Sequence, residues 1–463
     1  MENFWDFSVW GSFNLLAVLM ASLLVANVLR KSIKLLKNSL IPVSVLGGGV
    51  LIVVAGVYKL IAGEGMFDTA FFGGNGTANL ELITYHCLAL GFIASTFKPS
   101  KGKLTRKRTE EIFNTGVTTV STYLLQGVFG LAISIPAAWL VSDFFSAAGI
   151  LLPFGYGQGT GQALNYGGIF EADFGFVGGK SFGLTIAALG FLSASIGGVI
   201  HLSILNKRGV IRLQGQEKKL RSEDIESDNE IPMQESIDKL TVQIALIAVA
   251  YLLAYLLMFL LGCILPGMKS VIYGFNFLLG VLAATLVKLV MNLLKKKQII
   301  KKEYTNNFLM TRASNFFFDL MVVAGIAAIR FGALKDYWGV ILIMGVVGAV
   351  ITYVYNRIVA KVLFPEYAEE QFLTMYGMLT GTASTGIILL REIDGEFETP
   401  ASDNMVYQNF PAIVFGFPIM LLATYAPKEP VLTLVILTVF FVVMNIILFR
   451  SKIFYKRTKC LKK

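Results

Sequence analysis

Long apolar runs follow one another along almost the whole chain, and only short polar segments separate them. A helix needs about 20 consecutive apolar residues to cross a hydrocarbon core that is roughly 30 Å thick. The first run follows MENFWD, which contains no basic residue, so we expect a retained span rather than a cleaved signal peptide. The pattern predicts eleven membrane-spanning helices, at residues 10–29, 39–62, 80–97, 112–141, 181–205, 241–264, 270–293, 310–332, 338–360, 406–426 and 431–449.

Two further apolar segments, near 146–168 and 366–391, break the regular pattern. The first contains LLPFGYGQGTGQALNYGG and the second contains MYGMLTGTASTGIILLREID. Each glycine costs a helix about 1 kcal/mol relative to alanine, so we expect both helices to break near the middle of the membrane. Broken backbone at that depth persists only where it is buried in protein or lines a wet cavity. The sequence therefore predicts two re-entrant hairpins, one in each half of the chain.

Basic residues indicate how the spans are oriented, because cytoplasmic loops carry an excess of lysine and arginine. The loops after the first, third and seventh predicted spans are rich in these residues, whereas Glu64, Asp68 and Asp143 lie in intervening loops. This bias predicts an external N-terminus and a second half that begins in the cytoplasm. The two halves, with five spans and one hairpin each, are then inverted copies whose hairpins enter from opposite sides.

The pattern thus predicts an all-α polytopic membrane protein with four parts. Residues 1–205 form the first repeat, 206–240 form a hydrophilic cytoplasmic linker, and 241–426 form the inverted second repeat. Residues 427–463 add an extra span and a tail, RSKIFYKRTKCLKK, whose basic residues place the C-terminus in the cytoplasm. We expect a multi-pass protein of the cytoplasmic (inner) membrane of a cell.

Composition narrows the class of protein further. Hydrophobic residues make up 55% of the chain and charged residues only 15%, whereas a soluble domain has about 25% charged residues. The net charge of +10 comes mostly from residues that flank apolar runs, so topology explains it better than nucleic-acid binding does. The three cysteines and two histidines lie far apart and predict neither a disulfide nor a metal site. No nucleophile, base or metal-ligand constellation falls at one membrane depth, so we do not expect an enzyme.

The two breaks hold most of the polar residues that we expect to bind a ligand. A helix that starts after a break directs a positive dipole end and free N–H groups towards an anion, and unwound carbonyls coordinate Na⁺. Arg391 follows the second break and either reaches back towards an anionic substrate or, as we favour, extends to the cytoplasm. With Arg391, the predicted substrate-binding residues are Gln158, Gly159, Thr160, Gly161, Gln162, Thr382, Ser384, Thr385 and Gly386.

The candidate ligands for a coupling Na⁺ ion, or for a proton, are Asp319, Asn315 and Thr380. Asp319 lies inside a predicted span, where an unpaired carboxylate is costly and usually functional. Asn315 precedes it by one helical turn, and the alternative is a structural pair with another helix.

One polar face of the fourth predicted span also needs an explanation. It either lines a transport pathway or bonds to a neighbouring helix, and the sequence does not choose between them. The residues on this face are Thr115, Thr119, Thr122 and Gln126.

These motifs resemble the bacterial sodium/glutamate symporter family, in which a GxGTG hairpin, a second related hairpin and inverted halves of five spans are characteristic. Residues 157–161, GQGTG, are similar to the first tip of that family, and residues 381–393 resemble the second hairpin. IPVSVLGGGVL and LLQGVFG resemble its second and fourth spans. The resemblance reaches to about residue 426, and the eleventh span is additional.

The resemblance implies Na⁺-coupled symport of glutamate or a related small carboxylate by alternating access. It also implies a homodimer whose protomers each have a scaffold part and a moving part. Gln158 stands where histidine is expected and Ser384 where proline is usual, and such residues help to set substrate choice. The alternatives are a Na⁺- or H⁺-coupled transporter of another anionic metabolite, or an ion channel in which the tips form a filter.

Overall fold

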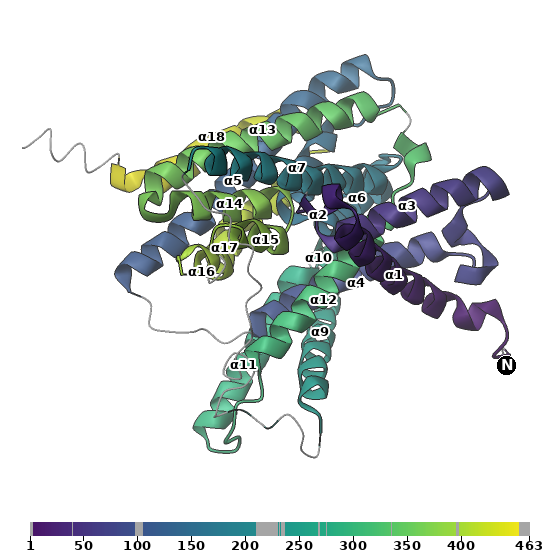
Figure 1. The fold of residues 1–463 in the computed structure, drawn as a ribbon, viewed down its shortest axis with the longest axis horizontal. Helices are drawn as coiled ribbons and strands as arrows, with labels where there is room; N and C mark the ends of the chain where they lie inside the picture. Colours follow the sequence, from purple (N-terminus) through teal and green to yellow (C-terminus); the bar gives the residue numbers. More distant parts are fainter. Residues whose placement is uncertain are drawn as a thin grey trace, which may run out of the picture. The chain divides into compact units, whose positions relative to one another are not determined.

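The computed structural model describes residues 3–38, 40–97, 105–209, 230, 232, 237–266, 269–274, 276–334, 336–394 and 398–452. These residues form helices and no β-strand apart from one isolated bridge between Glu230 and Glu303. The predicted all-α class is therefore confirmed (Figure 1). Most of the predicted linker and the end of the predicted basic tail lie outside the described residues.

Ten helices among the described residues are long and apolar enough to cross a membrane. An eleventh candidate is a bent pair, α16 (Ala401–Tyr407) followed by α17 (Asn409–Tyr425), whose axes differ by 52°. The chain is thus a multi-pass membrane protein, and each predicted span has a helical counterpart. The ten are α1 (Phe7–Ser32), α3 (Val43–Ala62), α4 (Gly76–Phe97), α5 (Arg106–Leu140), α7 (Gly179–Lys207), α9 (Lys239–Ile264), α11 (Asn276–Lys296), α12 (Asn307–Ala327), α13 (Trp338–Leu363) and α18 (Pro430–Leu448).

Several helix ends differ from the predicted ones for local reasons. α5 begins at Arg106, six residues before the predicted span (112 − 106 = 6), because a capped polar turn precedes the apolar run. The Thr105 side chain accepts a hydrogen bond from Arg108 N at 3.3 Å, which satisfies one of the free donors at the helix start. α3 begins directly after Pro42, since proline disfavours helical backbone at the residue before it. α12 ends at Ala327, and the single turn η6 (Phe331–Leu334) follows it.

The chain divides into two compact units, and each unit takes helices from both halves of the sequence. Unit 1 comprises Met1–Leu23, Gly48–Lys103 and Lys218–Ala327. Unit 2 comprises Leu24–Gly47, Leu104–Glu217 and Ala328–Lys463. The inverted relation of the two halves and the orientation of the termini stay predictions.

Unit 1 is built around α4, which packs against α9, α11 and α12. Its core includes Ile93, Phe97 and Met310, all fully buried. Gly91 lets α4 and α12 approach closely, because a Cβ atom there would lie 2.6 Å from the Phe318 ring. The Ser314 hydroxyl completes this contact by donating to Gly91 O at 3.0 Å.

Unit 2 is built around the 35-residue helix α5, which packs against α13, α17 and α18. Close backbone contacts between small residues hold its helices together, as in other membrane bundles. A Cβ atom on Gly130 of α5 would lie 2.0 Å from Gly149 O, and one on Gly183 of α7 would lie 2.4 Å from Ala163 O. Glycine at these positions is therefore required for the observed packing.

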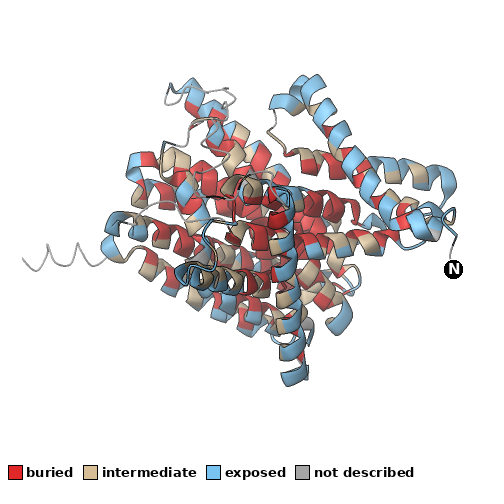
Figure 2. Ribbon diagram, turned by 90° about the horizontal axis from the view of Figure 1, so that it is seen from below, coloured by how far each residue is buried: buried red, intermediate tan, exposed pale blue. Residues whose placement is uncertain are grey.

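Exposed residues run along the helices of both units, and Figure 2 shows them in pale blue. On the candidate spans many of them are large and apolar, for example Leu252 and Phe259 of α9 and Val346 and Val350 of α13. A soluble protein rarely exposes so many large apolar side chains. Lipid chains are the natural cover for these faces.

Candidate functional site

The first predicted break forms a helical hairpin in unit 2. Its first arm contains η3 (Ser146–Ile150) and η4 (Pro153–Gly157), and its second arm is α6 (Thr160–Phe174). Gly159, at the turn, has φ = +82° and ψ = −170°, a conformation that is essentially restricted to glycine. Stacked rings of Phe154 and Tyr166, with centroids 3.9 Å apart, join the two arms.

The second predicted break forms a matching hairpin in the same unit. Its arms are α14 (Ala368–Thr380) and α15 (Ala383–Arg391), and only Gly381 and Thr382 separate them. The arms touch through two glycines: a Cβ atom on Gly377 would lie 2.8 Å from the Cα atom of Gly386. Both segments are therefore interrupted where the glycine and threonine patterns predicted, although re-entry into a membrane stays a prediction.

The tips of the two hairpins lie against each other. A Cβ atom on Gly159 of the first tip would lie 3.5 Å from Thr382 Cγ2 and 3.7 Å from Gly381 O of the second. Segments more than 200 residues apart in the sequence (381 − 159 = 222) thus meet at one place inside unit 2.

Four helix ends converge where the tips meet. η4 ends at Gly157 and α14 ends at Thr380, so their carbonyl ends lie there. α6 begins at Thr160 and α15 begins at Ala383, so their N–H ends lie there too. The first N–H groups of a helix have no acceptor within it, and the dipole makes this end attractive to anions. The same tips therefore offer one environment for an anion and another for a cation.

Gln162 supplies a further donor in the first turn of α6. The side chain is 1% exposed, and its Oε1 accepts a hydrogen bond from Asn165 Nδ2 at 3.2 Å. Its Nε2 is buried and has no hydrogen-bond partner. A buried amide donor without an acceptor costs roughly 1–3 kcal/mol. An anionic ligand would remove this cost.

Hydroxyl groups line the second tip. Thr385 is 1% exposed, and its Oγ1 lies 3.4 Å from Thr382 Oγ1. Thr380, a predicted Na⁺ ligand, is fully buried and donates its hydroxyl hydrogen to Tyr376 O at 2.6 Å. The lone pairs of its hydroxyl oxygen can still accept a hydrogen bond or bind a cation. Gly386 is buried in the arm contact, and the side chain of Ser384 lies outside the described residues.

The remaining predicted site residues lie in different surroundings. Gln158 caps the end of η4 and is half-buried, and Gly161 is buried in the first turn of α6. Arg391 is exposed at the far end of α15, eight residues and about 12 Å from its start. Asp319 and Asn315 are exposed residues of α12 in unit 1, whereas both tips belong to unit 2. Their role as cation ligands stays a prediction.

Gln126 of α5 is a residue at the tips that the sequence-based site did not include. Its fully buried side chain donates from Nε2 to Thr352 Oγ1 at 2.8 Å and to Leu379 O of the second hairpin at 2.9 Å. One turn before it, Tyr123 donates to Gly157 O of the first hairpin at 3.1 Å. The sequence signals were its place on the polar face of the fourth predicted span and in LLQGVFG, neither of which singled it out as a ligand.

The polar face of α5 bonds to neighbouring helices, as one of the two alternatives from the sequence predicted, and a role of this face in lining a pathway stays a prediction. Thr115 Oγ1 accepts from Gln371 Nε2 of α14 at 3.2 Å, and Thr122 Oγ1 accepts from Asn356 Nδ2 of α13 at 3.3 Å. These contacts tie α5 to α13 and to the first arm of the second hairpin.

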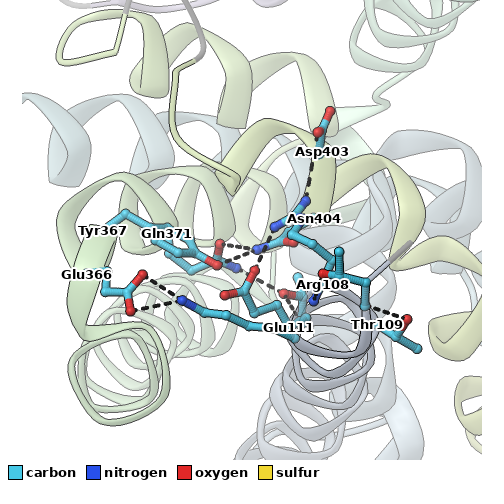
Figure 3. Close-up of polar contacts among 11 residues, drawn as sticks. Arg108, Thr109, Glu111, Glu366, Tyr367, Gln371, Asp403 and Asn404 are labelled. Atoms are coloured by element: carbon cyan, nitrogen blue, oxygen red, sulfur yellow. Dashed lines mark hydrogen bonds and ion pairs between the residues drawn. The ribbon is translucent and has the colours of Figure 1, made fainter. Parts of the chain in front are cut away.

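A polar network holds the base of the second hairpin to α5 and α16 (Figure 3). Asn404 Nδ2 donates to Tyr367 OH at 2.9 Å and to Gln371 Oε1 at 3.2 Å. Lys107 Nζ donates to both carboxylate oxygens of Glu366, at 2.9 and 2.8 Å. Burial raises the pKa of Tyr367, so its phenol stays protonated. The base of this arm is thus fixed, while its tip meets the first hairpin.

A second network joins α14 to α7 and α13 through a carboxylate. Nη1 and Nη2 of Arg357 each donate to Glu369 at 2.5 Å, and His201 Nε2 lies 3.0 Å from the same carboxylate. Because Nε2 donates to the carboxylate in neutral histidine, Nδ1 accepts from Tyr353 OH at 2.7 Å. Every polar atom of the imidazole is therefore paired in its neutral form.

The two networks predict different effects on stability. Glu369→Gln leaves the mostly buried Arg357 guanidinium without its charge partner, so we expect the free energy of unfolding to fall by roughly 2–3 kcal/mol. Glu366→Gln breaks an exposed pair with Lys107 that water and salt screen, so we expect a much smaller change in stability. Melting curves of the purified variants in detergent measure the difference, and equal losses would contradict it.

Among the described residues, no group of three or more histidine, cysteine or acidic side chains is placed to hold a metal ion. The residues named at the tips offer neutral oxygens, namely carbonyls, amides and hydroxyls.

No protein-family model matches the chain, and no curated protein matches it.

Proposed function

We propose that this protein is a secondary active transporter that binds a small carboxylate-bearing anion where its two hairpin tips meet. The observation that carries this proposal is the close approach of Gly159 to Gly381 and Thr382, which brings two helix N-termini near each other inside a membrane protein. Irregular backbone at membrane depth is expected only around a cavity or a buried site.

The chemistry of the tips favours a carboxylate over a cation as the transported substrate. The N-termini of α6 and α15 offer main-chain donors, Gln162 Nε2 lacks an acceptor, and Thr385 adds a buried hydroxyl. These groups match the acceptor oxygens of a carboxylate. Glutamate is the substrate that we favour, on the resemblance described above, and other small anionic metabolites are the alternative.

The division into two units supports alternating access as the mechanism. Both hairpins belong to unit 2, so a bound substrate can move with one compact body. Coupling to Na⁺ provides the driving force: one elementary charge that crosses 100 mV is worth about 2.3 kcal/mol. In this proposal the protein works in the cytoplasmic membrane as a homodimer and performs no covalent chemistry.

A panel of labelled compounds tests the substrate class. Purified protein in liposomes, with a Na⁺ gradient directed inwards, should take up glutamate or another small carboxylate but not the matching amide, such as glutamine. The amide lacks the charge that the helix N-termini stabilise. Equal uptake of carboxylates and their amides, or currents far above transporter turnover, would refute the proposal.

The buried hydroxyl of Thr385 gives a prediction at the second tip. Thr385→Val removes this hydroxyl at nearly constant shape, so we expect carboxylate uptake to fall by about tenfold, which is the effect of losing one hydrogen bond to a charged group. Binding of ²²Na⁺ without substrate should be retained. Thr438→Val, at an exposed position of α18, is the control and should transport normally. Equal uptake by both variants would exclude Thr385 from the site.

A further inference from the structure

The amide of Gln126 is placed between the two hairpins, and one of its atoms has no partner. Nε2 donates to Thr352 Oγ1 and to Leu379 O, whereas Oε1 is buried and accepts no hydrogen bond. The orientation of the amide is fixed by these contacts, because Leu379 O is a carbonyl and cannot donate to an oxygen. The atom that lacks a partner is therefore an oxygen.

The surroundings of this oxygen are carbonyl ends of helices. A Cβ atom on Gly157, the last residue of η4, would lie 3.2 Å from Gln126 Oε1, so the first tip borders the oxygen directly. Leu379, in the last turn of α14, accepts from the other end of the same amide. The last carbonyls of a helix have no donor within it, and the dipole makes this end negative.

A second buried oxygen, in the seam between α5 and α13 that also holds Gln126, has no donor either. Asn356 of α13 is 1% exposed, and its Nδ2 donates to Thr122 Oγ1 and to Thr352 O, at 3.3 and 2.9 Å. Its Oδ1 has no partner. The contacts of Gln126 with Thr352 and of Asn356 with Thr122 lie one helical turn apart along α5 and α13. This seam thus has unused acceptors and no unused donor among these two amides.

We propose that Gln126 Oε1, together with the carbonyl end of α14, binds the coupling cation, a monovalent ion of the Na⁺ class. Neutral carbonyl and amide oxygens at interrupted helices are suitable ligands for such an ion. The site lies in unit 2 with Thr380, one of the three cation ligands predicted from sequence, whereas the other two, Asp319 and Asn315, lie in unit 1. The role of this cation in coupling rests on the proposed transport function. Its binding can be measured without transport.

The placement explains how cation and substrate assist each other. The carbonyl ends of η4 and α14 and the N–H ends of α6 and α15 border the same pair of tips, separated by only two residues in each hairpin. Opposite charges held on the two sides attract each other in a medium of low dielectric constant. Each ion therefore raises the affinity of the tips for the other by the same factor.

Binding of ²²Na⁺ to purified protein, with no organic substrate present, tests the site. We expect Gln126→Leu to weaken Na⁺ binding by at least about tenfold, the effect of losing one strong ligand contact. Thr352→Val is the matched control, because it removes an acceptor of Nε2 but leaves Oε1 in place, and it should bind Na⁺ within about threefold of wild type. Asp319→Asn should bind Na⁺ like wild type.

A second variant, Gln126→Glu, tests the same site if Gln126→Leu does not fold. It retains Oε1 and adds a charge, so a folded glutamate variant should bind Na⁺ at least as tightly as wild type. Wild-type affinity in Gln126→Leu, or weaker binding in folded Gln126→Glu, would overturn the proposed site. Normal Na⁺ binding without any carboxylate uptake by the wild type would instead refute the proposed function and leave the cation site standing.

Discussion

Gly159→Ala should abolish uptake, because this residue shapes the turn of the first tip. Its φ of +82° with ψ of −170° lies in a region that costs other residues roughly 1–3 kcal/mol. Relief of that strain would move the first turn of α6 away from Gly381 and Thr382, which border Gly159. A shift of about 1 Å in a positioned site can reduce a rate by about 100-fold, so we expect uptake in proteoliposomes to fall at least that far.

Gly175→Ala is the matched control for backbone strain. Gly175 has φ = +72° at the end of α6, far from the tip in sequence, and no atom lies within 4 Å of the Cβ that alanine would add. This variant should lose some stability but keep the substrate affinity of the wild type. Similar uptake by the two variants would contradict the role given to the first tip.

Gln162→Glu should reduce substrate binding below detection. The substitution keeps the size of the side chain but replaces the buried Nε2 donor by a negatively charged oxygen at the N-terminus of α6. The new charge repels a carboxylate, and like charges held together cost several kcal/mol. Equilibrium binding of the labelled carboxylate at saturating Na⁺ measures the loss.

Gln162→Met separates loss of the donor from repulsion. Methionine has a similar size and no N–H group, so we expect the dissociation constant to rise by roughly 10- to 100-fold rather than binding to vanish. Na⁺ binding without substrate should be unchanged in both variants. If the glutamate variant bound the carboxylate as tightly as the methionine variant, the anion would not lie beside Gln162.

The interruptions of the helices were predictable from sequence because they depend on local chemistry. Glycine and threonine are poor helix formers in an apolar run, so both breaks could be located from composition alone. Glycine serves two different purposes here. Gly159 adopts a backbone conformation that other residues avoid, and Gly377 and Gly386 lack a side chain and so let the two arms pack closely. Ten of the eleven predicted spans could be located as single helices for the same reason, since length and hydropathy are local properties.

Pairing between distant segments was not predictable from a single sequence. Gln126 contacts Leu379, 253 residues away, and nothing in the chain shows that one amide joins these two positions. The grouping of spans into two interleaved units is likewise a property of packing. For this reason Asp319 was a natural candidate from sequence, since an acidic residue in a span is visible, whereas an unpaired amide oxygen is not.

In the proposed function, a Na⁺ gradient drives a small carboxylate across the membrane through the site at the meeting tips. The most direct measurement follows a labelled carboxylate into proteoliposomes under an inward Na⁺ gradient, before and after a Na⁺ ionophore collapses it. We expect accumulation above the external concentration with the gradient and loss of that accumulation after collapse. Uptake that is the same with and without the gradient would contradict it.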